Sequence, residues 1–256
     1  MAGRPTSRDV RAPARVDICG VGVDALTMAD TVALAEQIIA DGGPAQHVSI
    51  NAAKVVEAHH DPHMTEIIEH AGIANADGAS ILWAGRLLGC RLPERVTGID
   101  FMLTMWDRAA EAGYTVYLFG AKPATVEAAA DVARARGVKV VGARSGFYDD
   151  ESVVVAEIAE IAPDMLFVAL PTPAKELFIA DHLHELNAKL AVGVGGSFDV
   201  VAGEVTRAPV WMQRAGLEWA HRLIKEPQRI FRRYFLQNLG FFWLLLQARL
   251  HRIGRR

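Results

Sequence analysis

Short apolar runs rich in β-branched residues alternate with amphipathic helical patterns from residue 15 to about residue 194. The helical patterns between them are about 10–15 residues long, the length of a crossover helix between parallel strands. The runs at 115–119 and 165–170 are almost wholly apolar, as in strands buried on both faces. The alternation therefore predicts an α/β fold, in which a mostly parallel sheet has helices on both faces in a Rossmann-like arrangement.

Individual strands and helices follow from the same pattern. Thr27 precedes one helical pattern and Asp30 follows it by three residues, which resembles a capping box with Asp in place of Glu. The predicted strands are 15–20, 47–50, 72–76, 115–119, 138–141, 165–170 and 190–194. The predicted helices are 28–40, 52–60, 62–70, 79–88, 123–136, 151–161 and 174–186.

The composition excludes several protein classes. Of the 256 residues, 51% are hydrophobic and 22% charged, which is enough for a buried core and excludes disordered and fibrous proteins. The two cysteines, Cys19 and Cys90, cannot form a disulfide framework or a zinc cluster by themselves. They fit a reducing compartment, so we expect the protein to be cytoplasmic.

Charge is distributed unevenly along the chain. Residues 222–256 hold nine Lys and Arg against a single acid, Glu226, whereas the residues before them hold 18 bases and 29 acids. A basic tail on an acidic body predicts an anionic partner for the tail. We therefore divide the chain into a disordered leader (1–15) without the apolar run of a signal peptide, an α/β domain (16–210) and a basic amphipathic helical appendage (211–256).

The appendage carries a possible membrane-binding helix. From Gln228 on, helical spacing puts arginines on one face and apolar residues on the other, as in a helix that lies among lipid headgroups. The uncharged stretch 234–248 is shorter than the roughly 20 residues that span a bilayer. We favour docking on the inner face of the cell membrane. The alternative is a terminal helix packed on the domain with its arginines in water.

Two glycine-containing segments suggest nucleotide binding. The segment 20–25 loosely matches a dinucleotide fingerprint, but the helix opens only after Thr27, so we favour a turn at a strand end. Gly120 lies between a strand and a helix that starts at Pro123, where free amides favour a phosphate. The alternative for Gly120 is an ordinary strand–helix loop.

Further strand-end loops carry candidate site residues. Gly195 and Gly196 follow the last strand and allow a ligand close to the backbone, or form a tight turn. Asp77 follows another strand and is a candidate general base, with a helix N-cap as the alternative. Arg95 is a candidate anion ligand, with a solvated surface arginine as the alternative. No CxxC, HExxH, P-loop or GxSxG motif occurs, so we expect no metal site.

Several motifs together resemble a known family, the WecG/TagA/CpsF glycosyltransferases (glycosyltransferase family 26). The resemblance extends from about residue 16 to residue 236, in order and at compatible spacing. The motifs that carry it are 75–78 (NADG), 83–89 (WAGRLLG), 92–100 (LPERVTGID), 194–199 (VGGSFD), Gly203, 207–209 (RAP), 216–219 (GLEW), 226–227 (EP) and 232–234 (RRY).

The resemblance implies an inverting transfer of a sugar, N-acetylmannosamine in some members, from a UDP-sugar to a sugar on a polyprenyl diphosphate. Such members work at the cytoplasmic membrane face and build teichoic acid, common antigen or exopolysaccharide. No cofactor is expected, since the UDP-sugar is a substrate. The implied partners are the UDP-sugar, the lipid-linked acceptor and an anionic membrane surface, with a homo-oligomer left open and no nucleic acid.

The resemblance also implies roles for single residues. Asp77 matches the proposed catalytic base, Ser49 the position of a family Thr, Asn51 a nearby Asn, and Arg95 an active-site arginine. Three arginines match those of an appendage thought to close over the site and neutralise a diphosphate, and these are Arg222, Arg229 and Arg232.

One loop departs from the family pattern. Where the family commonly reads Pro-Lys-Gln-Glu, this chain has Pro173, Ala174, Lys175 and Glu176. Lys175 replaces the family's Gln, so the identity of the donor sugar is left open. Three alternatives remain for the ammonium group: it faces the UDP phosphates, it faces a carboxylate on the donor sugar, or it points into solvent. Two functions of other classes also stay open, a Rossmann-type oxidoreductase and a non-catalytic membrane adaptor.

Overall fold

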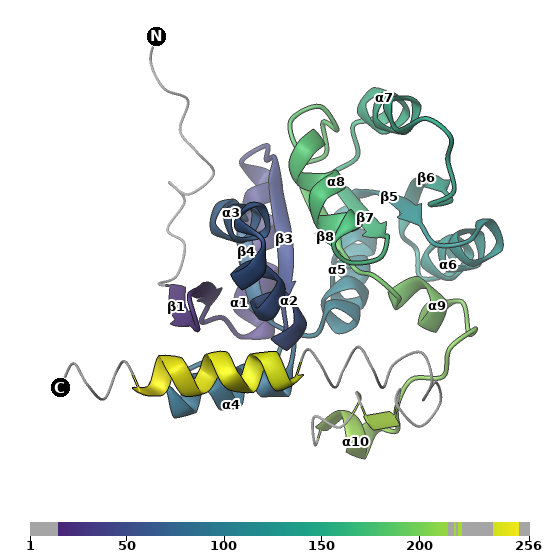
Figure 1. Ribbon diagram of the computed structural model, residues 1–256. Helices are drawn as coiled ribbons and strands as arrows, with labels where there is room; N and C mark the ends of the chain where they lie inside the picture. The colour runs from purple at the N-terminus through teal and green to yellow at the C-terminus, as the bar shows by residue number, and fades with distance from the viewer. Residues whose placement is uncertain (1–14, 215–217, 219, 222–237, 251–256) are drawn as a thin grey trace, which may run out of the picture.

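The computed structural model describes residues 15–214, 218, 220–221 and 238–250 (Figure 1). The strands are β1 (Arg15–Ile18), β2 (Val21–Asp24), β3 (Ala45–Ile50), β4 (Ile73–Ala76), β5 (Thr115–Gly120), β6 (Lys139–Arg144), β7 (Met165–Ala169) and β8 (Leu190–Gly193). The helices are α1 (Met28–Ala40), α2 (Ala52–His60), α3 (Pro62–His70), α4 (Ala79–Leu87), α5 (Gly98–Ala112), α6 (Pro123–Ala135), α7 (Glu151–Ile161), α8 (Ala174–His182), α9 (Ser197–Val201) and α10 (Val210–Arg214). Residues 238–250 are also helical and are called the terminal helix below.

The strands form one sheet in the order β1-β2-β4-β3-β8-β7-β5-β6. Every neighbouring pair is parallel except β1 and β2, which form an antiparallel hairpin at one edge. Residues of α1, α5 and α6 pack in one cluster, and residues of α2, α3 and α4 and of α7 and α8 pack in two others. This arrangement confirms the predicted α/β fold with helices on both faces of the sheet.

Local sequence signals account for the best-predicted boundaries. Thr27 and Asp30 form the expected capping box at the start of α1, with Asp30 N–H donating to Thr27 Oγ1 at 3.1 Å. The observed ends of α1, α2, α3 and α7 are those predicted from the sequence. The helix α5 was not predicted, although Thr97 caps it by accepting from the Asp100 N–H.

The hairpin corrects the interpretation of the first strand. The predicted strand 15–20 ends at Ile18, and Cys19 and Gly20 form a turn in which both residues have positive φ, 55° and 85°. The turn joins β1 to β2, so the glycines of 20–25 belong to a hairpin, and α1 starts only after Thr27. The favoured interpretation as a strand-end turn is confirmed, and the dinucleotide fingerprint is wrong.

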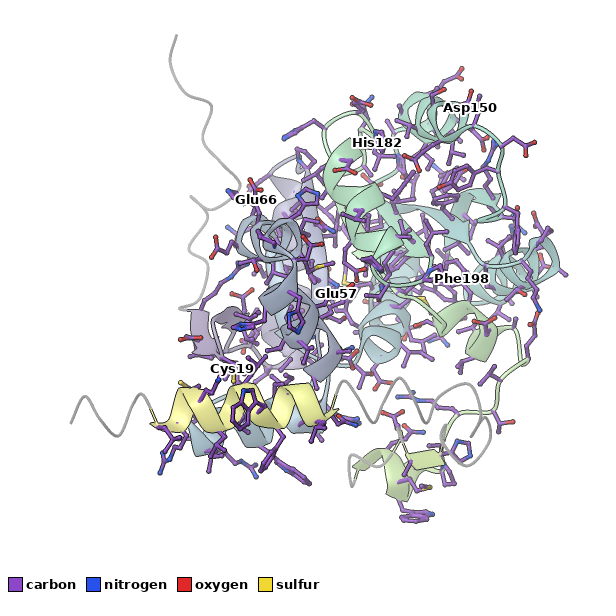
Figure 2. All side chains as sticks on the ribbon, in the orientation of Figure 1. Cys19, Glu57, Glu66, Asp150, His182 and Phe198 are labelled. Atoms are coloured by element: carbon purple, nitrogen blue, oxygen red, sulfur yellow. The ribbon has the colours of Figure 1, made fainter. Side chains whose placement is uncertain are left out.

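The terminal helix packs on the α/β domain. Its Phe241 and Leu244 are buried in the cluster formed by α2, α3 and α4, and Arg249 Nη1 donates to the Leu87 carbonyl at 2.7 Å. Figure 1 shows this helix, in yellow, lying along α4, and Figure 2 places Cys19 of the hairpin beside it. One face of the terminal helix therefore packs on the α/β domain, as we expected under the alternative to membrane docking.

The opposite face of the terminal helix remains apolar and exposed. Its exposed large side chains are Leu239, Phe242, Trp243, Leu246 and Leu250. Across the described ranges, none of the helices is both long and apolar enough to cross a membrane. The basic helical segment expected from Gln228, with Arg222, Arg229 and Arg232, lies outside the described residues.

Candidate active site

The carboxyl ends of β3 and β4 bring two candidate residues together. The strands are parallel neighbours with Ile50 opposite Ala76, so the residues that follow them, Asn51 and Asp77, lie at the same edge of the sheet. Asp77 N–H donates to the Ile50 carbonyl at 2.8 Å, which fixes the backbone of Asp77 to the end of β3. Ligands bind outside the carboxyl ends of strands in such sheets, so this edge is the candidate site.

Asp77 is half-buried at the turn into α4. The N-cap of α4 is Gly78, so the interpretation of Asp77 as the N-cap is wrong. A Cβ on Gly78 would lie 3.6 Å from the Asn51 Cβ, so the backbone at Gly78 passes close to Asn51. Asn51 itself caps α2, its Oδ1 accepting from the Lys54 N–H at 3.1 Å. The side chain of Asn51 is thus partly committed to the fold.

Ser49 lies one layer deeper than Asp77. Its side chain is buried, and its Oγ has no hydrogen-bond partner among the described residues. A Cβ on Gly98 would lie 3.3 Å from this oxygen, so the start of α5 covers the hydroxyl. Opposite Ser49 in the β3–β4 register, Asn75 is fully buried, and its Oδ1 is likewise without a hydrogen-bond partner in the described ranges.

His47 extends this buried polar row along β3. Its ring stacks on Phe101 with centroids 4.4 Å apart, and burial lowers the pKa of His47 to about 3. The ring is therefore neutral at physiological pH. The side chains of His47 and Ser49 are therefore uncharged polar groups buried beneath the candidate site.

Two hydrogen bonds hold Arg95 next to the end of β4. Asn75 Nδ2 donates to the Val96 carbonyl at 2.6 Å, and the Val96 N–H donates to the Ala76 carbonyl at 2.8 Å. Arg95 therefore sits on a loop that is clamped to the residues just before Asp77. The structure brings together the predicted residues Asp77, Asn51, Ser49 and Arg95.

Arg95 is engaged by the C-terminal part of the chain. Its Nη1 donates to Glu218 Oε2 at 2.8 Å, and its Nη2 donates to the Gln213 carbonyl at 2.8 Å. The alternative of a solvated surface arginine is wrong. Glu218 also accepts from Arg207 Nε at 3.3 Å, so the carboxylate links two arginines.

Arg207 is fixed by a second carboxylate. Its Nη1 and Nη2 donate to the two oxygens of Asp100 at 2.7 and 2.8 Å, in a bidentate pair. Burial would raise the pKa of Asp100, but the hydrogen bonds from Arg207 and Thr97 hold it below its usual value. Arg207 is thus held as a charged group in one orientation.

Lys175 and Glu176 belong to a buried ionic cluster that also contains Lys54. Lys54 Nζ lies 2.7 Å from Glu176 Oε1 and donates to the Ser49 carbonyl at 2.7 Å. Lys175 Nζ lies 2.9 Å from Glu176 Oε1 and also donates to Thr172 Oγ1. The three charged side chains are almost fully buried, so the interpretation of Lys175 as a solvent-facing residue is wrong.

Burial and neighbouring charge shift the protonation of this cluster. Burial and the repulsion of Lys54 lower the pKa of Lys175 to about 8. Burial would raise the pKa of Glu176, but Lys54 and Lys175 hold it below its usual value. Glu57 of α2, labelled in Figure 2, is half-buried beside the cluster, and burial together with Glu176 raises its pKa. The two lysines thus share the Glu176 carboxylate, and Glu57 is the next acidic group beside them.

The glycine loops lie farther along the same edge. Gly120 ends β5 with φ 117°, and a Cβ there would lie 2.5 Å from the Ala169 carbonyl carbon, so only glycine fits. Pro123 stands in the first turn of α6, as expected, and no side chain caps that helix. Gly195 has φ 52° and Gly196 is the N-cap of α9. β8 and β7 separate the Gly120 loop from β3.

Sequence reasoning missed three residues of this region. Lys54 looks like an ordinary helix lysine, and only the packing of α2 against α8 places it on Glu176. Arg207 and Glu218 lie in motifs that carry the family resemblance, but their pairing with Asp100 and Arg95 joins positions more than 100 residues apart. Within the described residues, no three His, Cys, Asp or Glu side chains gather in a group that could hold a metal ion.

A parallel sheet with a carboxylate, an ordered arginine and glycine loops at its carboxyl edge is typical of enzymes that act on nucleotide-linked substrates. Comparison with known proteins identifies the class as a glycosyltransferase. Residues 16–255 match the Glycosyl transferase WecG/TagA/CpsF family, and the chain belongs to this family.

Two curated relatives come from Bacillus. The chain is 32% identical over 183 residues to a protein of Bacillus subtilis (strain 168) and 35% identical over 186 residues to one of Bacillus spizizenii (strain ATCC 23059 / NRRL B-14472 / W23). Each alignment covers 71% of this chain and 72% of the relative. Both relatives are named N-acetylglucosaminyldiphosphoundecaprenol N-acetyl-beta-D-mannosaminyltransferase.

The lowered pKa of Lys175 predicts a pH-dependent stability difference between the wild type and Lys175→Gln. The unfolded chain keeps this proton up to about pH 10.5, whereas the folded protein releases it near pH 8. Between these values the unfolded state binds more protons, so the wild type gains stability as pH rises. Measured by urea unfolding, the stability of the wild type relative to Lys175→Gln should be lowest at pH 7. It should rise toward pH 10.5 by on the order of 3 kcal/mol.

The matched control is Lys139→Gln, which removes the same charge at an exposed position of β6. A stability difference for Lys175→Gln that does not change between pH 7 and pH 10 would contradict the charged, desolvated state of Lys175.

Proposed function

We propose that the protein is an inverting glycosyltransferase that moves a sugar from a UDP-sugar to a sugar on a polyprenyl diphosphate. The observation that carries this function is Asp77 at the β3–β4 edge, with Arg95 clamped beside it by Val96. An NAD-dependent oxidoreductase would use the glycine motif at 20–25 to bind its dinucleotide, but here Gly20 forms the turn of the β1–β2 hairpin. A membrane adaptor would need no carboxylate at this position.

The names of the relatives support specific substrates. Both relatives are named for an N-acetylmannosaminyl transfer to N-acetylglucosaminyldiphosphoundecaprenol. We assign this chain the same acceptor class, a polyprenyl diphosphate that carries an amino sugar, and a place in the synthesis of a cell-surface polysaccharide. Because the Lys175 ammonium is buried and already contacts Glu176 and Thr172, we propose that it does not bind a carboxylate on the sugar and that the donor is a neutral acetamido sugar.

Asp77 acts as general base in the proposed reaction. Its carboxylate accepts the proton of the acceptor hydroxyl while that oxygen forms a bond to the anomeric carbon. The bond between the anomeric carbon and the β-phosphate oxygen breaks on the opposite face, so the configuration inverts and UDP leaves. Arginines and helix N-termini at the carboxyl edge stabilise the charge on the leaving diphosphate. We propose no metal ion for this step, with Arg222, Arg229 and Arg232 as further cations.

We propose that the protein docks on the inner face of the cell membrane through two helices. α4 exposes Trp83 and Leu87, and the terminal helix beside it exposes the apolar face described above. Exposed tryptophan and leucine side chains with arginines nearby are typical of surfaces that insert into a lipid interface. The docking would bring Asp77, which only Gly78 separates from α4, to the lipid-linked acceptor.

The central test is sugar transfer by Asp77→Asn. An amide cannot accept the hydroxyl proton, so the turnover should fall by about 10²–10⁴ while the fold is retained. Transfer is measured with a panel of neutral and carboxylated UDP-sugars and a polyprenyl-diphosphate amino-sugar acceptor, with and without a chelator. The charge-matched control is Asp149→Asn, an exposed residue before α7. Wild-type turnover in Asp77→Asn, or loss of transfer with the chelator, would contradict the proposed mechanism.

The membrane surface is tested by Phe242→Ser combined with Trp243→Ser. Both side chains are more than half exposed, so the substitutions should leave the fold intact and lower binding to phosphatidylglycerol vesicles about tenfold or more. Binding is measured by vesicle co-sedimentation. The control is Phe147→Ser combined with Val153→Ser, which removes exposed apolar side chains around the start of α7. Equal vesicle binding by both double variants would place the membrane contact elsewhere.

A further inference from the structure

Two arginines converge on one carboxylate beside the candidate site. Arg95 Nη1 lies 2.8 Å from one oxygen of Glu218, and Arg207 Nε lies 3.3 Å from the other. The two guanidinium groups come from the loop before α5 and from the segment after α9. Each of these three side chains is about one-fifth exposed, so the pairs are reachable from solvent.

The partners of Arg207 fix it independently of Glu218. Asp100 takes both terminal nitrogens of Arg207 in a bidentate pair, and the Asp100 N–H and carboxylate are in turn bonded to Thr97 Oγ1. Arg95 is fixed in the same way by the Gln213 carbonyl at 2.8 Å. Removing Glu218 would therefore leave two oriented guanidinium groups, one of them without its counter-charge.

We propose that Arg95 and Arg207 form a diphosphate-binding clamp, and that Glu218 fills this clamp until the diphosphate of a substrate displaces it. A guanidinium group binds carboxylate and phosphate oxygens in the same geometry, so one ligand can replace the other. The two arginines, Asp100 and Glu218 together have a net charge of zero. When a diphosphate replaces Glu218, the two arginines gain a partner with a larger negative charge. The inference deepens the proposed function, because both of its substrates carry a diphosphate.

Glu218 then competes with the substrate rather than helping it to bind. Displacement of the carboxylate would break the contacts of Glu218 with Arg95 and Arg207 and leave the contact of Arg95 with the Gln213 carbonyl. The competing interpretation is that Glu218 only positions Arg95. The two interpretations predict opposite effects of the same substitution on anion affinity.

The test is Glu218→Gln in the full chain, with affinity for inorganic pyrophosphate measured by calorimetry. The substitution keeps the size of the side chain and removes its charge. We expect Glu218→Gln to bind pyrophosphate about 3–10-fold more tightly than the wild type does. The affinity of Glu218→Asp should lie between those of Glu218→Gln and the wild type. The control Glu160→Gln removes the same charge from an exposed position of α7 and should match the wild type. Unchanged or weaker pyrophosphate binding by Glu218→Gln, with a melting temperature like that of the wild type, would overturn the clamp.

Two ligands then identify the source of the diphosphate. If the donor enters the clamp, Glu218→Gln should tighten binding of UDP; if the acceptor does, it should tighten binding of farnesyl diphosphate. A double variant, Glu218→Gln with Arg207→Lys, should lose the gain because the oriented fork is gone. A gain that persists in the double variant would overturn the role of Arg207.

These measurements read binding and need no sugar transfer. Tighter pyrophosphate binding without any transfer activity would support the clamp and contradict the proposed function. Sugar transfer by the wild type, without tighter pyrophosphate binding by Glu218→Gln, would support the proposed function and contradict the clamp.

Discussion

The parallel pairing of β3 with β4 determines where the residues of the candidate site lie. Ile50 and Ala76 stand opposite each other, so Asn51 and Asp77 leave the sheet side by side. The carbonyl groups at the two strand ends are also used: Ile50 accepts from Asp77 and Ala76 accepts from Val96. A shift of register between these two strands would separate Asp77 from Asn51 and from the Ile50 carbonyl. The sheet is thus the scaffold that gives the carboxylate its neighbours.

Around this scaffold, charged side chains contact one another in groups rather than in single pairs. Lys54, Glu176 and Lys175 form one group under the sheet edge, and Arg95, Arg207, Asp100 and Glu218 form another on the C-terminal side. The first is deeply buried and the second is reachable from solvent. Buried ion pairs add little net stability but hold side chains in one geometry. The two groups therefore fix the positions of lysine and arginine side chains that an exposed surface would leave free.

The sequence alone predicted most of the framework and only part of the site. Helices with a local cap, such as α1 with Thr27 and Asp30, were placed correctly because the signal lies within a few residues. The hairpin was missed because Cys19 and Gly20 are not a typical turn pair, and α5 because its cap follows a polar loop. Asp77 and Arg95 were found as single residues. Their partners were not, since the contact of Arg95 with Glu218 depends on the packing of segments 123 residues apart.

If the protein docks on a membrane through α4, as proposed above, the position of this helix determines how far Asp77 lies from the lipid. Only Gly78 separates Asp77 from this helix, and Trp83 and Leu87 are exposed on it. With the axis of α4 parallel to the bilayer, the carboxylate would stand about one helix diameter, 10–12 Å, from the lipid surface. A diphosphate and one sugar fill most of that height, whereas a longer saccharide would carry its terminal hydroxyl past the carboxylate. The thickness of a single helix would then act as a ruler that selects lipids early in chain growth over those that are already extended.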